Sequence, residues 1–224
     1  MSRPIAILRP EPGNRATVER LRAAGFTPIA MPLFQVRAID WSVPAGERYD
    51  ALLLTSANAV RFGGPALGAL LSLPVLAVGA ATAAAAKERG FAVPLTGDSG
   101  VAALLGHCQA RDYPRLLHLG GRDRLVTAGG AVARAITVYA ADAIAIGEER
   151  LRQIEHGVAM LHSARAASKL RALTETAAVD RSTIRIAAIS ATVAAAAGKG
   201  WAALDSAAIP SDDALIALAG RLAD

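Results

Sequence analysis

Several residue types are scarce in this chain, and each scarcity excludes a class of protein. Among 224 residues there is a single cysteine, Cys108, so the chain can form neither a disulfide framework nor a thiolate metal cluster. We interpret Cys108 as a small buried apolar residue. The four histidines have no ligand spacing with carboxylates, so no metal is expected.

Lysine and aromatic residues are also few. The formal net charge is +5, yet lysine supplies only three of the 24 basic residues and aromatics make up 4% of the chain. Nucleic-acid-binding proteins usually present a basic stripe or stacking aromatics, whereas these arginines are scattered. We therefore expect no nucleic-acid partner and favour a small polyanionic ligand, which arginine binds well.

No apolar run is long enough, without interruption, to span a bilayer. Residues 62–86 carry no charge, but turn residues divide them into a helix, a turn and a buried strand. These turn residues are Gly63, Gly64, Pro65, Gly68 and Pro74. The chain opens on an apolar strand without the pattern of a signal peptide, so we expect a cytoplasmic protein with no membrane partner.

The chain contains a repeated strand-to-helix corner, that is, a strand followed directly by a cap residue and a helix. Residues 49–60 (YDALLLTSANAV) return as residues 156–167 (HGVAMLHSARAA), and residues 75–86 (VLAVGAATAAAA) return as 186–197 (IAAISATVAAAA). An apolar run that ends near a hydroxyl residue and continues as an alanine-rich stretch is typical of strand, cap and helix. Two halves that each present helix N-termini indicate an anion site.

The fold class follows from short apolar strands that alternate with helices, which indicates parallel sheets covered on both faces and an α/β protein throughout. Glycines at 25, 90 and 198 or 200 are expected to end helices, each before a new strand or edge. Residues 57–71 and 125–133 are among the predicted helices. The predicted strands are residues 4–8, 27–31, 51–54, 75–78, 116–119, 136–139, 158–161 and 184–189.

Two extended segments, residues 32–39 and 137–144, continue past the natural end of a strand. Runs that outlast their sheet are candidates for linkers between domains, so we place the hinge there.

In their order and spacing, seven motifs resemble the uroporphyrinogen-III synthase family over essentially the whole chain. They are residues 7–10 (ILRP), 25–32 (GFTPIAMP), 54–60 (LTSANAV), 78–82 (VGAAT), 119–125 (LGGRDRL), 136–139 (ITVY) and 188–192 (AISAT). The resemblance implies a lyase of tetrapyrrole (heme) biosynthesis that needs no cofactor. It would cyclise the linear hydroxymethylbilane to uroporphyrinogen III with inversion of ring D and loss of water.

The resemblance also implies two similar parallel-sheet α/β domains, flavodoxin/Rossmann-like, joined by a two-stranded linker ladder. On this sequence the first domain would be residues 1–36 plus 141–224 and the second residues 37–140, with linkers near 33–39 and 139–144. We expect a monomer whose partner is the polycarboxylate substrate, and a transient contact with the preceding pathway enzyme stays open.

The catalytic candidates are Tyr139 and Thr82. In the family a tyrosine at the end of the ITVY motif lies at the hinge and faces the cleft, so Tyr139 is the candidate general acid. The alternative is an amphipathic residue that packs in the ladder with its hydroxyl in water. Thr82 follows Gly79, whose missing side chain lets a ligand approach the backbone, and its alternative role is an ordinary helix cap.

The expected substrate-binding residues are Arg9, Ser56, Asn58, Gly79, Arg124, Ser163 and Thr192. For the serines, helix capping alone is the alternative, and for the arginines it is an ion pair or solvation. Thr192 would replace a hydroxyl that the family places elsewhere in this corner. His162 precedes Ser163 and is not expected to be catalytic.

Two other classes of function compete with this prediction. A two-domain small-anion binding or sensor protein would bind such a ligand without turnover. A flavodoxin-like nucleotide or flavin domain is disfavoured, because no G-x-G-x-x-G loop follows a strand.

Overall fold

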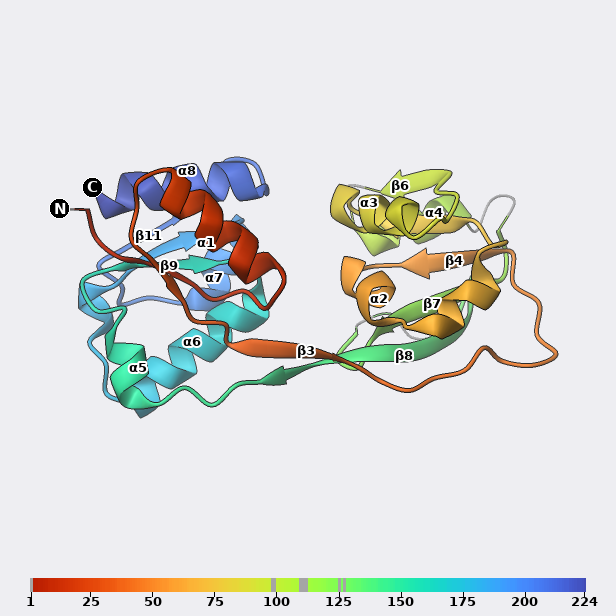
Figure 1. Cartoon of the computed structure of the whole chain (residues 1–224), viewed down its shortest axis with the longest axis horizontal. Coiled ribbons are helices and arrows are strands. Elements are labelled where there is room, and N and C mark those ends of the chain that lie inside the picture. The colour runs from red at the N-terminus through yellow and green to blue at the C-terminus, as the bar shows by residue number, and fades with distance from the viewer. Residues whose placement is uncertain (1, 98–99, 109–112, 125, 127) are drawn as a thin grey trace. The chain divides into compact units, whose positions relative to one another are not determined.

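Two sheets organise the chain in the computed structural model (Figure 1), which describes residues 2–97, 100–108, 113–124, 126 and 128–224. The chain divides into two compact units. Unit 1 comprises Met1–Gln35 and Ala143–Asp224, and unit 2 comprises Val36–Asp142. The strand pairs β1–β2, β1–β9, β9–β10 and β10–β11 of the first sheet are parallel, as are most of those in the second, which confirms the predicted α/β class.

The sheet of unit 1 has the strand order β11-β10-β9-β1-β2. Its strands are β1 (Ile5–Ile7), β2 (Pro28–Ala30), β9 (Val158–Leu161), β10 (Arg185–Ala188) and β11 (Ala203–Ser206). The helices of this unit are α1 (Gly13–Ala23), α5 (Glu148–Arg152), α6 (Ala164–Thr176), α7 (Ala191–Ala197), α8 (Asp212–Ala223) and the 3₁₀ helix η2 (Arg181–Thr183).

Both faces of the unit 1 sheet are covered. Helices α1 and α8 lie on one face, and α6 lies on the other (Figure 1). On the first face, Leu21 of α1 and Leu215 of α8 pack against Ile5 and Val158 of the central strands. All residues of β1 and β9 are buried, which is why these strands read as continuous apolar runs.

The second sheet has the strand order β3-β8-β7-β4-β5-β6. Its strands are β3 (Phe34–Ala38), β4 (Ala51–Leu54), β5 (Val75–Val78), β6 (Leu95–Gly97), β7 (Leu116–Gly121) and β8 (Val132–Ala143). The helices are α2 (Ala57–Phe62), the 3₁₀ helix η1 (Pro65–Leu70), α3 (Ala80–Glu88) and α4 (Val101–Cys108). The edge strands β6 and β11 follow the helix-ending glycines, as expected.

The faces of the second sheet are covered by different helices. Leu52 and Leu54 of β4 share a core with the alanine-rich faces of α2 and α3. Leu53 of the same strand packs in a separate cluster with Leu104 of α4. Small alanine side chains let α2 and α3 approach each other closely. Their N-termini lie beside the ends of β4 and β5 because each helix begins two or three positions after its strand ends. The predicted burial of Cys108 concerns a side chain that lies outside the described part of α4.

Strands β3 and β8 form an antiparallel pair. The amide of Ile39 donates to Val138 O at 3.0 Å, and the amide of Ile144 donates to Leu33 O at 3.0 Å. The division between the two units falls within these two strands. The predicted extended conformation of residues 32–39 and 137–144 is confirmed for most of both segments.

Two predicted helices are wrong. Residues 128–130 of the proposed helix 125–133 form a turn and β8 begins at Val132, while Leu125 and Thr127 lie outside the described residues. Gly129 and Gly130 have positive φ, which breaks a helix before the β-branched run. The proposed helix 57–71 ends at Phe62, because Gly64 has φ +67° and Pro65 starts η1.

Candidate functional site

The predicted site residues gather at the carboxyl edge of their own sheet. In parallel sheets the strands all end at this edge, where ligands usually bind. In unit 1, Arg9 follows β1, Ser163 follows β9 and Thr192 lies in the first turn after β10. Unit 2 has the larger set, which is Ser56 and Asn58 after β4, Gly79 and Thr82 after β5, Arg124 after β7, and Tyr139 within β8.

The two predicted serines cap their helices. Ser56 Oγ accepts from the Asn58 amide, and Ser163 Oγ accepts from the Ala166 amide, each at 3.2 Å. The capping interpretation is therefore confirmed for both. A cap satisfies one of the first amide groups of a helix and leaves others available to an anion, so capping and binding are compatible.

In the strand-to-helix corner after β10, the helix cap is a serine that was not among the predicted site residues. Ser190 caps α7 by accepting from the Val193 amide at 3.4 Å. Thr192 is exposed in the first turn of the helix, so its hydroxyl is not needed for capping. Its role in binding stays a prediction.

Gly79, not Thr82, occupies the N-cap position of α3. Gly79 has φ +85°, and a Cβ built there would meet no atom within 4 Å. The backbone conformation, not crowding, requires glycine, and the open space leaves the helix start accessible. Thr82 is 4% exposed within the first turn, so its predicted capping role is wrong.

A buried histidine lies behind this edge in unit 2. His118 on β7 is fully buried, and its Nε2 is 3.3 Å from Thr55 Oγ1. Burial and the charge of Arg124 lower the pKa of His118 to about 4, so the ring is neutral at pH 7. The sequence analysis missed this residue, because apolar neighbours surround it and the only signal is a polar residue in an apolar run.

Arg124 is folded against its own unit. Its Nη1 donates to Gly121 O at 3.1 Å and also to Thr137 Oγ1. Its Nη2 donates to Ala135 O at 3.4 Å. Arg124 therefore ties the end of β7 to β8, and a substrate carboxylate would have to compete with these acceptors.

Tyr139 packs against the end of β7. Tyr139 pairs in register with Gly121, and a Cβ on Gly121 would lie 2.8 Å from Tyr139 Cζ. Tyr139 is half-buried and packs against the hydrophobic core to which α2 and α3 contribute. Among the described residues, no side chain or backbone group makes a hydrogen bond to its hydroxyl. The phenol is therefore held in place by packing.

The close contact predicts a cost for any side chain at Gly121. Gly121→Ala is expected to lower the free energy of unfolding by about 1–3 kcal/mol, because Tyr139 must move to accept the methyl group. Urea unfolding followed by circular dichroism measures this change. Gly106→Ala in α4 is the control: the added Cβ meets open space, so stability should rise by roughly 0.5–1 kcal/mol. Equal effects for both variants would contradict the packing argument.

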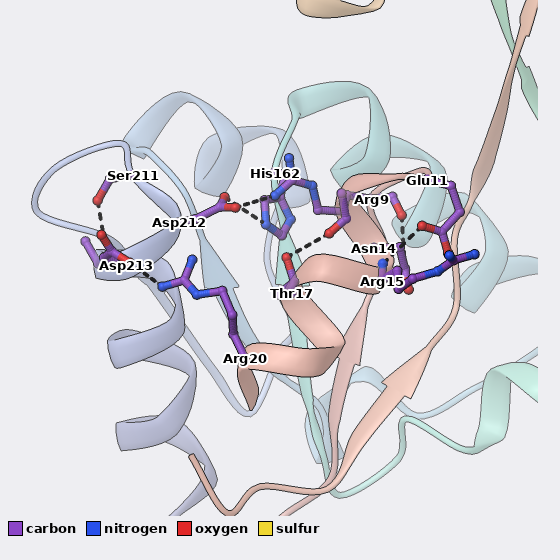
Figure 2. Close-up of polar contacts among 12 residues, drawn as sticks. Arg9, Glu11, Asn14, Arg15, Thr17, Arg20, His162, Ser211, Asp212 and Asp213 are labelled. Atoms are coloured by element: carbon purple, nitrogen blue, oxygen red, sulfur yellow. Dashed lines mark hydrogen bonds and ion pairs between the residues drawn. The ribbon is translucent and has the colours of Figure 1, made fainter. Parts of the chain in front are cut away.

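Unit 1 carries a polar cluster above the ends of β1 and β9 (Figure 2). Arg9 Nη1 donates to Asp212 Oδ2 at 2.6 Å, and Asp212 Oδ1 is 3.6 Å from His162 Nε2. The Arg9 guanidinium lies over Gly13, where a Cβ would approach Arg9 Nε to 2.4 Å. Asn14 Nδ2 holds the strand end by donating to Ile7 O at 2.7 Å and Arg9 O at 3.0 Å.

His162 is neutral in this cluster. Burial and the nearby charge of Arg9 lower the pKa of His162 to about 4, although the Asp212 carboxylate acts in the opposite direction. The contact between Arg9 and Asp212 shows that the ion-pair alternative for Arg9 is correct. Because both side chains are partly exposed, the remaining guanidinium donors of Arg9 still reach solvent.

Comparison with known proteins gives the family. The model of the uroporphyrinogen-III synthase HemD family matches residues 15–217. The chain belongs to the uroporphyrinogen-III synthase family. It is therefore an enzyme of tetrapyrrole biosynthesis, and the non-catalytic binding protein is not favoured.

Solved structures share the fold of this family member. A uroporphyrinogen-III synthetase from Helicobacter pylori 26695 is 16% identical with a TM-score of 0.65, and the match covers 99% of this chain and 100% of that chain. A mutant uroporphyrinogen III synthase from the extremely thermophilic bacterium Thermus thermophilus is 18% identical with a TM-score of 0.53, covering 97% and 96%. A search of curated proteins found no match.

At the site of this family member, the sequence analysis missed Asp212 and gave His162 no role, because their partners are distant in sequence. Asp212 is 203 positions from Arg9, and nothing in its local pattern predicts the ion pair. His162 follows an apolar strand directly, so its burial could have been anticipated but not its neighbours.

Within the described residues, no helix is long and apolar enough to cross a membrane.

Proposed function

We propose that this chain closes hydroxymethylbilane to uroporphyrinogen III, inverting ring D and releasing water, with its substrate bound at the carboxyl edges of its sheets. Family membership over residues 15–217 supports this reaction most directly. The residues at these edges add a chemical reason, since helix starts and arginines suit a polycarboxylate.

The substrate carries eight carboxylates, so binding requires many distributed donors and no single deep pocket. The capped N-terminus of α6 after Ser163, the open start of α3 at Gly79 and the guanidinium of Arg9 supply donors of this kind. Ser56, Asn58, Arg124 and Thr192 complete the proposed binding set. Each donor contributes modestly, so loss of one should weaken binding without abolishing it.

The chemistry asks little of the protein beyond positioning. In the outline that the family implies, the terminal hydroxyl leaves as water to give an azafulvene cation, which closes through a spiro intermediate that fragments and recloses with ring D reversed. The pyrrole nitrogen expels the hydroxyl, so the protein must mainly fold the chain so that the spiro-forming carbon is nearest.

Tyr139 is the proposed proton donor to the departing hydroxyl. Its ring packs against Gly121. Among the described residues, no group makes a hydrogen bond to its phenol oxygen. Thr82, almost fully buried, is proposed to shape the start of α3 and not to exchange protons.

The product isomer tests the proposed reaction. Purified protein without added metal or cofactor should convert hydroxymethylbilane to the type III isomer, because spontaneous closure gives the symmetric type I isomer. Chromatography of the oxidised products separates the two, with buffer alone as the control. Formation of type I only would refute the assignment.

We further propose a cytoplasmic monomer that receives its substrate in a transient contact with the preceding enzyme. Spontaneous closure to type I gives a reason for such a contact, since a short transfer limits that loss. Gel filtration of the purified chain tests the monomer.

A further inference from the structure

The carboxylate of Asp212 lies between two groups, the charged guanidinium of Arg9 and the neutral imidazole of His162 (Figure 2). Its Oδ2 accepts from Arg9 Nη1 at 2.6 Å, and its Oδ1 faces His162 Nε2 at 3.6 Å. The Arg9 side chain is 27% exposed and that of Asp212 36%, whereas the His162 side chain is 8% exposed. A ligand can thus reach Arg9 and Asp212, while His162 lies behind them.

His162 is left without a hydrogen bond. Neither ring nitrogen has a partner among the described residues, although both are buried. The 3.6 Å separation from Asp212 is too long for a hydrogen bond. A buried polar group without a hydrogen-bond partner is costly. The imidazole ring of His162 is nine-tenths buried and faces the Asp212 carboxylate without a hydrogen bond, so it is positioned to form one when the carboxylate moves closer.

The charged surroundings of His162 are few. Arg9, which follows β1, and Asp212, on α8, are the charged groups that act on its pKa, and they act in opposite directions. Charged groups on the other packed elements have partners of their own: Arg20 of α1 pairs with Asp213, Glu11 accepts from the Arg15 amide, and Arg165 of α6 lies over the Phe34 ring.

We infer that a substrate carboxylate displaces Asp212 from Arg9, and that Asp212 then pairs with His162, which takes up a proton from solvent. The inference rests on the proposed function, because it needs a polycarboxylate ligand. The incoming negative charge is offset by the proton, so the net charge of the cluster is unchanged. No covalent bond forms or breaks.

The geometry supports this exchange at little conformational cost. Asp212 is the first residue of α8, and the preceding Ser211 caps the helix by accepting from the Ala214 amide at 3.2 Å. A side-chain rotation can therefore move the carboxylate from Arg9 toward His162 without disturbing the helix. Gly13 leaves room for the Arg9 guanidinium, which lies where the Cβ of any other residue would be. His162 and Asp212 are thus positioning residues that prepare Arg9 for the substrate.

Proton uptake on binding tests the exchange. Anaerobic titration calorimetry with uroporphyrinogen III at pH 6, in two buffers of different ionisation enthalpy, measures the protons bound per ligand. The wild-type protein should take up close to one proton for each ligand bound. Because binding then requires a proton, KM should rise by up to about tenfold for each unit by which the pH increases, between roughly pH 5 and 7. His162→Phe should take up almost none and show a flat KM profile in this range.

Two further variants complete the design. Asp213→Asn is the matched control, because it breaks the exposed Arg20–Asp213 pair between the same two helices and should retain wild-type proton uptake. Asp212→Asn keeps the side-chain shape but cannot stabilise the protonated ring, so its uptake should also be lost. It tests the exchange even if His162→Phe does not fold.

The outcomes separate this inference from the proposed function. Type III product together with no proton uptake in the wild type, or with equal uptake in His162→Phe, overturns the exchange and leaves the reaction intact. No ligand binding and only type I product overturn both.

Discussion

Tyr139→Phe is expected to lower kcat about 100-fold, the loss usual for a positioned general acid, while KM changes little. The asymmetry arises because eight carboxylates spread binding over many donors, whereas one leaving hydroxyl has one proton source. The fold should be unaffected, since the phenyl ring keeps its contact with Gly121. Single-turnover assays with isomer analysis measure the effect.

Tyr49→Phe provides the matched control in the same unit. The Tyr49 hydroxyl donates to Glu47 Oε2 at 2.6 Å, so its removal should cost about 1 kcal/mol of stability and leave kcat unchanged. If Tyr139→Phe retained nearly full activity with type III product, water or a substrate carboxylate would supply the proton. The protein would then act as a folding template without an essential acid.

Acid is expected to destabilise the protein well before its carboxylates titrate. His118 and His162 each have a folded-state pKa of about 4 against an ordinary value of 6.5. Between these values the unfolded chain binds more protons, so stability is full above pH 6.5 and falls as the pH drops toward 4. The loss should be on the order of 3 kcal/mol for each histidine. Urea unfolding between pH 4 and 7.5 measures it.

Substitutions assign this acid sensitivity. His118→Leu removes one of the two titrating groups and should reduce the pH dependence by about half. His156→Asn is the control, because His156 is exposed and has φ +58°, a conformation that asparagine tolerates. A free energy of unfolding that stays constant from pH 7 to 4.5 in the wild type would show that neither histidine is buried in its neutral form.

Local sequence determined the elements whose signal is continuous. The strands at 51–54, 75–78 and 158–161 were predicted with the bounds that the structure has, because each is a fully apolar run with a serine or glycine corner after it. The same corners fixed Ser56 and Ser163 as caps, since a cap depends on the residue and the next three amides alone. The repeat of the corner also placed the predicted anion site at helix starts.

Tertiary structure decided what depends on distant partners. The twelve-residue strand β8 begins at Val132, inside the end of the predicted helix 125–133, because Gly129 and Gly130 turn the chain and β7 offers a parallel edge. The protonation states of His118 and His162 depend on burial and on arginines brought near by folding. Arg9 meets Asp212 across 203 positions, and only the packing of α8 on the sheet creates that pair. Short-range patterns specify strands and caps, whereas charge pairing and pKa require the three-dimensional neighbourhood.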